Sequence, residues 1–180
     1  MAQTATIYNL TIDLSNVDRG VYETIELRIA RQPSETLEYM LLRVFAYCLE
    51  YQEGIALTEG VASGNEPAIL VRDMTGRITA WIEVGLPDPA RLHRGSKFAE
   101  RAAVYTNRVG LLLRHFEGSR IHKVEEVPIY ALDSDFVEAV AKLIDRRSAI
   151  GLSVTEQQIY LTVGGRDFSS AIAEHRISQD

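Results

Sequence analysis

Two glutamates of this sequence, Glu66 and Glu83, have the chemistry and the spacing to hold one divalent cation. Strand-like runs over 68–72 and 78–84 predict a β-hairpin between them. A turn centred on residues 75–76 makes the two glutamates diagonal neighbours on one face of that hairpin. Diagonal positions lie about 7–8 Å apart, close enough for two carboxylates to share a cation. A register slip of one residue would send one of them to the other face.

Glu83 stands in an otherwise apolar run, Trp81-Ile82-Glu83-Val84. Because buried charges are usually paired or bound to metal, this position predicts either a metal ligand or an ion pair. In the ion-pair alternative, Glu83 lies on an edge strand and its partner is Arg72 or Arg43. Glu66 likewise has a plain alternative, as part of a loop over 64–67 that enters a strand.

A basic stripe is the second feature with chemical potential. Residues 89–123 contain eight Lys or Arg against two Glu, which gives this segment a net charge of +6. Because the whole chain has a net charge of −6, the remaining residues together carry −12. On an expected helix over 88–101, four bases fall within about a third of a turn: Arg91, Arg94, Lys97 and Arg101. The stripe predicts a local phosphate-binding surface, with a solvated helix face as the alternative.

The elements that must position these residues follow from the hydrophobic period. A helix is expected from Ser34 to about residue 54, with Ser34 as N-cap, and a capped N-terminus of this kind can also receive a phosphate. The remaining expectations are a hairpin over 4–14 and 22–29, a helix over 108–116, strands at 104–106 and 127–131, a helix from 133 or 134 to about 146, and a hairpin over 150–154 and 158–163. The tail after residue 165 has no strong period.

Strands mixed with helices, without a linker or a repeat, predict one domain over 1–180 of the α+β or α/β class, with a mixed sheet and flanking helices. One cysteine in 180 residues excludes a disulfide framework and multi-cysteine zinc sites. The sequence lacks the phosphate-loop, dinucleotide, nucleophile-elbow and zincin motifs. With no signal peptide or apolar span, we expect a cytoplasmic protein without membrane contact.

Three separated motifs resemble the YaeQ family of bacterial proteins: Arg31-Gln32-Pro33-Ser34-Glu35-Thr36, Glu66-Pro67 and Trp81-Ile82-Glu83-Val84-Gly85-Leu86-Pro87-Asp88. The resemblance runs over essentially the whole chain. It implies a variation of the PD-(D/E)XK nuclease core, a superfamily that cuts phosphodiester bonds with a divalent metal. By resemblance, Glu66 and Glu83 are the acidic residues of the core strands, and Glu38 is the additional carboxylate on the preceding helix. Such a set of oxygen ligands suits Mg²⁺ or Mn²⁺.

The sequence departs from the superfamily pattern at the lysine, whose position is taken by Gly85. The acidic residue also precedes its proline, as Glu66-Pro67, and the literal Pro87-Asp88 is interpreted as the start of the next helix. We expect the missing cation to come from that helix. Arg94 can stabilise charge there but cannot act as a base, whereas Lys97 can do either.

Two classes of function follow. The first is a metal-dependent nuclease in which Glu66, Glu83, Arg94 and Lys97 act at the phosphodiester. The alternative is a non-catalytic scaffold that binds nucleic acid or a protein partner, with a role in transcription as one option, and the missing lysine and net charge of −6 favour it. An interaction domain that never contacts nucleic acid is a third option. Convergence of Glu38, Glu66 and Glu83 in one cleft is the feature that separates them.

Overall fold

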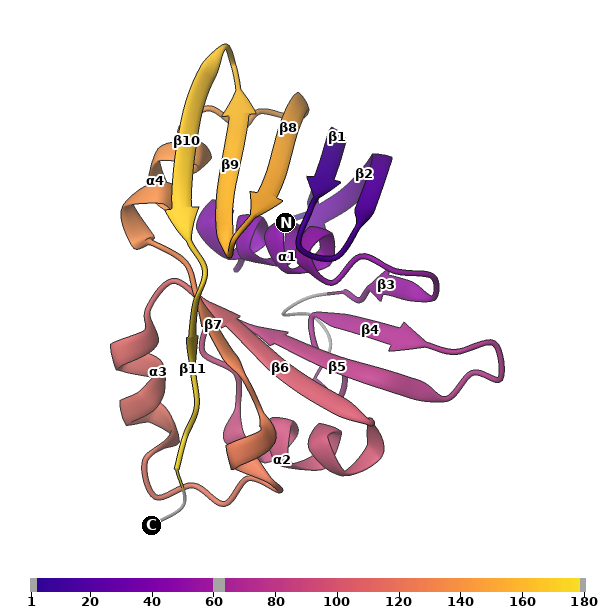
Figure 1. The fold of residues 1–180 in the computed structure, drawn as a ribbon, viewed down its shortest axis with the longest axis vertical. Coiled ribbons are helices and arrows are strands. Elements are labelled where there is room, and N and C mark those ends of the chain that lie inside the picture. Colours follow the sequence, from indigo (N-terminus) through magenta and orange to yellow (C-terminus); the bar gives the residue numbers. More distant parts are fainter. Residues whose placement is uncertain (1–2, 60–63, 179–180) are drawn as a thin grey trace. The chain divides into compact units, whose positions relative to one another are not determined.

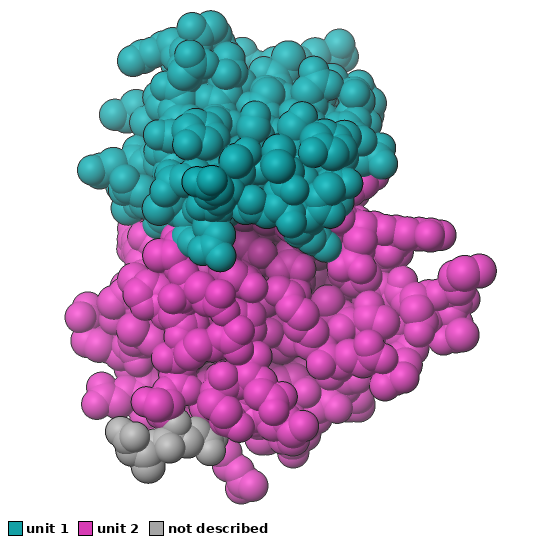
Figure 2. Space-filling model, in the orientation of Figure 1, with its two compact units in different colours: residues 1–41, 132–172 teal, residues 42–131, 173–180 magenta. Residues whose placement is uncertain are grey.

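The computed structural model describes residues 3–59 and 64–178 and has a mixed α+β fold (Figure 1). The chain divides into two compact units, each built from two separate stretches of sequence (Figure 2). Unit 1 comprises residues 1–41 and 132–172, and unit 2 comprises residues 42–131 and 173–180. Instead of one mixed sheet, the described residues form two, one in each unit.

Unit 1 is a five-stranded sheet with the order β10-β9-β8-β1-β2. Its elements are β1 (Thr6–Asn16), β2 (Val21–Arg31), the first turn of α1 (Leu37–Leu49), α4 (Ser134–Ala141), β8 (Arg147–Thr155), β9 (Gln158–Val163) and β10 (Arg166–Ala171). Apolar residues alternate along β1 and β2 and are buried. The antiparallel pairing of β1 with β2 and of β8 with β9 confirms the two expected hairpins. The two hairpins meet through a parallel pairing of β1 with β8.

The tail after residue 165 differs from the expectation, because it forms two further strands. Residues 166–171 are β10, which pairs with β9, and Ala173–His175 are β11, which pairs with β7 of unit 2. On β10 only Ser170 is buried. A strand with so few buried positions shows no apolar alternation in its sequence, so the sequence does not predict it. Its backbone pairing with β9 places it in the sheet.

Unit 2 is a six-stranded sheet with the order β11-β7-β6-β5-β4-β3. Its further elements are β3 (Ile55–Leu57), β4 (Ile69–Arg72), β5 (Ile78–Val84), α2 (Pro89–Phe98), β6 (Arg101–Thr106), α3 (Val109–Phe116), the short helix η2 (Val124–Glu126) and β7 (Ile129–Ala131). β5, β6 and β7 run parallel, while β3 and β4 are antiparallel to their neighbours. Parallel neighbours need a crossover, and α2 and α3 supply the two crossovers.

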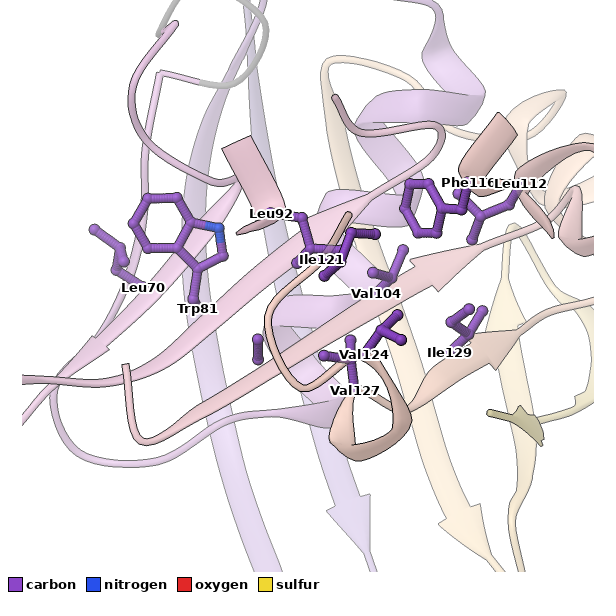
Figure 3. Close-up of a cluster of buried hydrophobic side chains, with 11 residues drawn as sticks. Leu70, Trp81, Leu92, Val104, Leu112, Phe116, Ile121, Val124, Val127 and Ile129 are labelled. Atoms are coloured by element: carbon purple, nitrogen blue, oxygen red, sulfur yellow. The ribbon is translucent and has the colours of Figure 1, made fainter. Parts of the chain in front are cut away.

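One hydrophobic cluster holds α2 and α3 on the same face of this sheet (Figure 3). Trp81 and Val104 project from the strands, and Leu92, Leu112 and Phe116 project from the two helices. The backbone of α2 approaches so closely that a Cβ at Gly95 would stand 2.2 Å from the Trp81 ring. A glycine is therefore required where α2 crosses Trp81.

The α-helices of the described residues are short and amphipathic, with lengths of 8 to 13 residues. Among those residues, no helix combines the length and the apolar character needed to cross a membrane.

Candidate functional site

The β4–β5 hairpin has the register that the sequence predicts. Ile69 pairs with Ile82 and Leu70 pairs with Trp81, and a shift appears only beyond Val71. The turn is held by the Asp73 carboxylate, which accepts hydrogen bonds from the backbone N–H groups of residues 75 and 77 and from the Thr75 hydroxyl, and these bonds lower the Asp73 pKa. Glu83 consequently lies on the same face of β5 as Trp81, the face that α2 covers.

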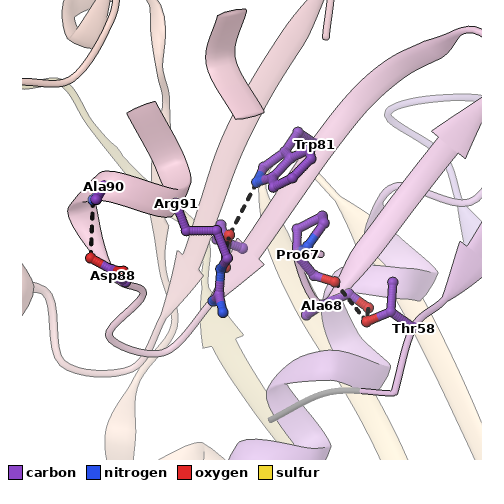
Figure 4. Close-up of polar contacts among 8 residues, drawn as sticks. Thr58, Pro67, Ala68, Trp81, Asp88, Ala90 and Arg91 are labelled. Atoms are coloured by element: carbon purple, nitrogen blue, oxygen red, sulfur yellow. Dashed lines mark hydrogen bonds and ion pairs between the residues drawn. The ribbon is translucent and has the colours of Figure 1, made fainter. Parts of the chain in front are cut away.

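Glu83 is 1% exposed, and both of its carboxylate oxygens accept hydrogen bonds. Figure 4 labels the two donor residues, Trp81 and Arg91. Its Oε1 accepts hydrogen bonds from the Trp81 indole Nε1 at 3.0 Å and from Arg91 Nε at 2.8 Å, and its Oε2 accepts one from Arg91 Nη2 at 2.6 Å. This is a two-pronged ion pair between a central strand and the first turns of α2. The edge-strand expectation was therefore wrong, because β5 lies between β6 and β4 and the partner is neither Arg72 nor Arg43.

Gly85, at the position of the superfamily lysine, has a backbone that a lysine would not readily adopt. Its φ is +76°, in the left-handed region, and its N–H donates to the Tyr105 carbonyl at 2.8 Å. Three residues later the chain reaches the start of α2, where Asp88 is the N-cap and its carboxylate accepts from the Ala90 N–H at 3.0 Å. Pro87-Asp88 thus opens a helix, as the sequence predicts.

Glu66 lies in a different environment from Glu83. It is exposed in a bend before β4, outside the strand, so the strand alternation does not fix the face of its side chain. The chain immediately after Glu66 is fixed, because the Thr58 hydroxyl donates to the carbonyls of Pro67 at 2.6 Å and Ala68 at 3.3 Å (Figure 4). The expected register is confirmed, whereas Glu66 is an exposed carboxylate in a bend and Glu83 is a buried one in an ion pair.

Glu38 lies in the first turn of α1 and belongs to unit 1, whereas Glu66 and Glu83 belong to unit 2. Over residues 3–59 and 64–178, no three His, Cys, Asp or Glu side chains form a group that could hold a metal ion. Glu83, in addition, directs both oxygens at a guanidinium. The described residues as arranged do not fit Mg²⁺ or Mn²⁺, and the metal site stays a prediction.

Ser34 is not the cap of α1. The helix begins at Leu37, and the Thr36 hydroxyl accepts from the Tyr39 N–H at 3.1 Å, which makes Thr36 the N-cap. Ser34 occupies an exposed turn before it. The neighbouring Glu35 is buried and accepts from the Gln32 N–H at 3.3 Å, so the polar residues of this segment order the approach to the helix.

The four bases of the predicted stripe do not share one helix face. α2 ends at Phe98, so Arg101 begins β6 instead of continuing the helix. Side chains alternate along a strand, so Arg101 projects to one face of the sheet while Trp81 and Glu83 project to the other. Arg91 is bound to Glu83 and therefore lies on the face away from Arg101. Arg91 and Arg101 are therefore each paired with a carboxylate, and of the four bases Arg94 and Lys97 are the two that are exposed on α2.

Arg101 belongs to a second buried polar network, centred on Glu50 directly after α1. The Glu50 oxygens accept from Arg101 Nη1 at 2.7 Å, from Arg101 Nη2 at 2.9 Å and from the Tyr105 hydroxyl at 2.7 Å. Arg101 Nη2 also reaches the Tyr130 hydroxyl at 3.4 Å. Burial, followed by the Glu50 charge, raises the pKa of Tyr105 well above its ordinary value. This network was missed because its members stand far apart in sequence.

A cation cluster forms where the last turns of α2 meet the loop before η2. We use this name for Arg94, Lys97 and Arg120 together with His93 and His122. The His122 N–H donates to His93 Nδ1 at 2.9 Å and joins the two segments. Desolvation and the charges of Lys97, Arg120, His122 and Arg94 lower the His93 pKa. In the described part of the chain, Arg94, Lys97 and Arg120 form no ion pair with a carboxylate.

A cavity of about 320 Å³ borders the cation cluster. Lys97, His122 and Lys123 line it together with two carboxylates, Glu100 and Glu126. Lys123 Nζ lies 4.0 Å from Glu126, and Glu100 pairs with Arg77 at 3.2 Å. The cavity therefore offers both hydrogen-bond donors and acceptors. The basic count over 89–123 pointed to this region, but only the fold brings residues 93–97 and 120–123 together.

Comparison with known proteins identifies relatives of this fold. The profile of the family described as "YaeQ protein" matches residues 1–172. The uncharacterized protein YaeQ of Escherichia coli K12 is 29% identical over 164 residues, which is 90% of this chain and 91% of the relative, and that of Salmonella typhi is 28% identical over the same length and shares.

Two solved structures are similar over nearly the full chain. The crystal structure of the YaeQ protein from Pseudomonas syringae has a TM-score of 0.83 and 30% sequence identity, and the match covers 99% of each chain. The YaeQ protein from Xanthomonas axonopodis pv. citri matches with a TM-score of 0.81 and 22% identity, over 97% of this chain and all of the other, and supports the fold.

Proposed function

This chain belongs to the YaeQ family, and from that premise we propose that it binds nucleic acid through unit 2 without cleaving it. In this proposal the buried carboxylate of the nuclease-like core is neutralised by Arg91, and the cation cluster contacts phosphates. The protein is then a binding scaffold that retains the core of a nuclease. The observation that carries the proposal is the division of the basic segment into bound cations and unpaired ones.

The non-catalytic part of the proposal is supported by the state of Glu83. Both oxygens accept strong, charge-assisted hydrogen bonds from Arg91, and Trp81 adds a third bond to Oε1. A guanidinium keeps its proton at any physiological pH, so this cation is permanent. The position of the superfamily lysine, which would complete a catalytic set, is a glycine with φ of +76°.

The binding part is supported by three cations that form no ion pair with a carboxylate among the described residues. Arg94, Lys97 and Arg120 gather around His93, and like charges that are held together favour an anionic ligand. A chain with a net charge of −6 repels nucleic acid as a whole, so contact has to be local. The cation cluster is the described region of unit 2 that meets this need.

Binding is tested by fluorescence anisotropy with labelled DNA and RNA oligonucleotides over a salt series, without divalent metal. The double variant Arg94→Ala/Lys97→Ala should weaken binding to all sequences and lower the slope of log K against log salt by about one per lost phosphate contact. The matched control is Arg28→Ala/Lys142→Ala, which removes one exposed arginine and one exposed lysine from unit 1.

Three results would contradict the proposal. The first is an absence of binding at low salt, and the second is equal weakening by the cluster variant and its control. The third is binding to polyglutamate as tight as binding to the oligonucleotides, which would indicate an acidic protein partner instead.

Phosphodiester hydrolysis is the second candidate function, and the confirmed register of the β4–β5 hairpin favours it. By resemblance it would use Glu83 and Glu66 with Mg²⁺ or Mn²⁺, and Glu83 would first have to separate from Arg91. Calorimetric titration of Mn²⁺ into the wild type, Arg91→Gln and Arg91→Gln/Glu83→Gln tests this. Binding that appears in Arg91→Gln and is lost in the double variant would favour hydrolysis and justify a cleavage assay. Absence of binding in all three proteins would exclude this candidate.

A further inference from the structure

We infer that the nucleic acid bound by unit 2 is single-stranded, with Phe98 stacking on an unpaired base and the adjacent cavity receiving a neighbouring nucleoside. This inference rests on the proposed function and names its ligand class. It is carried by three features that occur together at one end of α2: an exposed aromatic ring, unpaired cations, and a cavity that presents charges of both signs.

Phe98 is 71% exposed although it is the last residue of a helix whose other face packs on the sheet. Within the described residues of unit 2 it is the one aromatic side chain among the large exposed hydrophobics. The backbone accounts for this exposure. Leu92 and Gly95 form the buried side of α2, and Ala99, seven positions after Leu92, continues that side against the core cluster. Phe98 stands six positions after Leu92, so it points about a third of a turn away from this side.

Phe98 stands between two residues that line the cavity. Lys97 directly precedes it and also belongs to the cation cluster, while Ala99 directly follows it. An exposed aromatic ring and cations in one surface region are the combination that single-strand binding surfaces use, because the ring stacks on a base while the cations contact the backbone. A duplex has no free base face to offer such a ring, since its bases stack on each other.

The contents of the cavity favour a nucleoside over a bare phosphate. Lys97, Lys123 and His122 offer donors to phosphate or carbonyl oxygens, whereas Glu100 and Glu126 can accept hydrogen bonds from amino groups of bases. A site for inorganic phosphate alone would gain nothing from two carboxylates. Its volume of about 320 Å³ lies within the range of small-molecule sites.

The test compares a labelled single strand of about 12 nucleotides, a length that one small domain can cover, with the same strand annealed to its complement. We expect the single strand to bind at least about tenfold more tightly, and Phe98→Leu to weaken single-strand binding by roughly 5- to 100-fold while duplex binding is unchanged. Tyr160→Leu removes an aromatic ring that is 52% exposed on unit 1 and should leave both affinities unchanged. Circular dichroism confirms that both variants are folded.

The outcomes separate the inference from the function beneath it. If single strand and duplex bind equally, or if Phe98→Leu behaves as Tyr160→Leu, the inference is overturned. The proposed function then still stands, provided that Arg94→Ala/Lys97→Ala weakens binding. If neither form of nucleic acid binds, both fail. A further support for the cavity is a loss of single-strand affinity in Lys123→Ala, with Lys142→Ala as its matched control.

Discussion

The basic segment of unit 2 contains two kinds of cation, and they differ in what holds them. Arg91 and Arg101 make two-pronged ion pairs with the buried carboxylates Glu83 and Glu50, on opposite faces of the sheet. Arg94 and Lys97, which follow Arg91 by three and six positions, are exposed. Proximity in the sequence thus predicts the positive charge of a region but not its availability, because availability depends on which carboxylates the fold brings alongside.

The two kinds also contribute differently to the protein. A buried pair adds little net stability, yet losing one member is costly because the other is left charged without a partner. An exposed cation contributes almost nothing to stability and remains free to meet an outside anion. We therefore expect mutation of the bound cations to lower the free energy of unfolding. Mutation of the exposed cations should instead lower the affinity for nucleic acid.

The strongest way to break this comparison is Arg91→Ala. It leaves Glu83 buried with Trp81 as its remaining hydrogen-bond donor, and we expect the free energy of unfolding to fall by about 3–5 kcal/mol in urea denaturation. Arg94→Ala is the matched control and should change it by less than about 0.5 kcal/mol. Similar losses in the two variants would remove the distinction.

Arg101→Ala sharpens the comparison within the bound class. Glu50 would keep its hydrogen bond from Tyr105, and the Arg101 side chain is 39% exposed, so we expect a smaller loss of about 1.5–3 kcal/mol by the same measurement. Adding Tyr105→Phe should then cause a further loss, because among the described residues it removes the remaining hydrogen bond to the Glu50 carboxylate. A loss larger than that of Arg91→Ala would reverse the expected order.

Gly95→Ala tests whether the packing of α2 fixes the Glu83 pair. The new Cβ would meet the Trp81 ring at 2.2 Å, so the ring or the helix must move, and we expect a loss of about 1–2 kcal/mol with a shift in tryptophan fluorescence. At Gly110 on α3 nothing lies within 4 Å of a new Cβ. Gly110→Ala should instead stabilise the protein by about 0.5 kcal/mol, and destabilisation there would show that helix packing is not the cause.

The smallest expected effect is on the pH dependence of stability, and it comes from His93 in the cation cluster. The lowered His93 pKa means that the unfolded chain binds this proton more tightly than the folded one. The contribution of His93 to stability is therefore complete above the ordinary pKa of about 6.5 and is lost as the pH falls through the lowered value. His93→Gln should make the decline in stability between pH 7 and pH 5 shallower. An identical pH profile for His93→Gln and the wild type would contradict the clustering of Arg94, Lys97, Arg120 and His122 around His93.

Features set by local sequence could be predicted well. The β4–β5 register follows from one turn and the alternation on either side, and the start of α2 follows from Asp88-Pro89. The cap of α1 was misplaced because Ser34 and Thr36 are both suitable caps, and only the backbone decides which hydroxyl faces the first turn.

Features set by distant contacts could not be predicted in the same way. Glu50 looked unremarkable in sequence because Arg101 and Tyr105 reach it only after β6 has joined the sheet. Arg91 was assigned to a phosphate-binding stripe because nothing local reveals that α2 folds back over Glu83. Phe98 was not singled out at all, since an apolar residue near a helix end is expected in a core unless the end of the helix is known.

The parallel pairing of β1 with β8 has a consequence for the order in which the chain can fold. Ile12 pairs with Ile150, and nearly all of unit 2 lies between them in sequence, so this contact closes a very long loop. Closing such a loop is entropically unfavourable and slow, whereas β4, β5, α2 and β6 follow one another along the chain. We expect pulse-labelling hydrogen exchange during refolding to find the β5 and β6 amides protected before those that join β1 to β8, and the reverse order would contradict this. During synthesis on a ribosome, the β1–β2 hairpin would therefore stay unpaired on the β1 side until β8 has been translated.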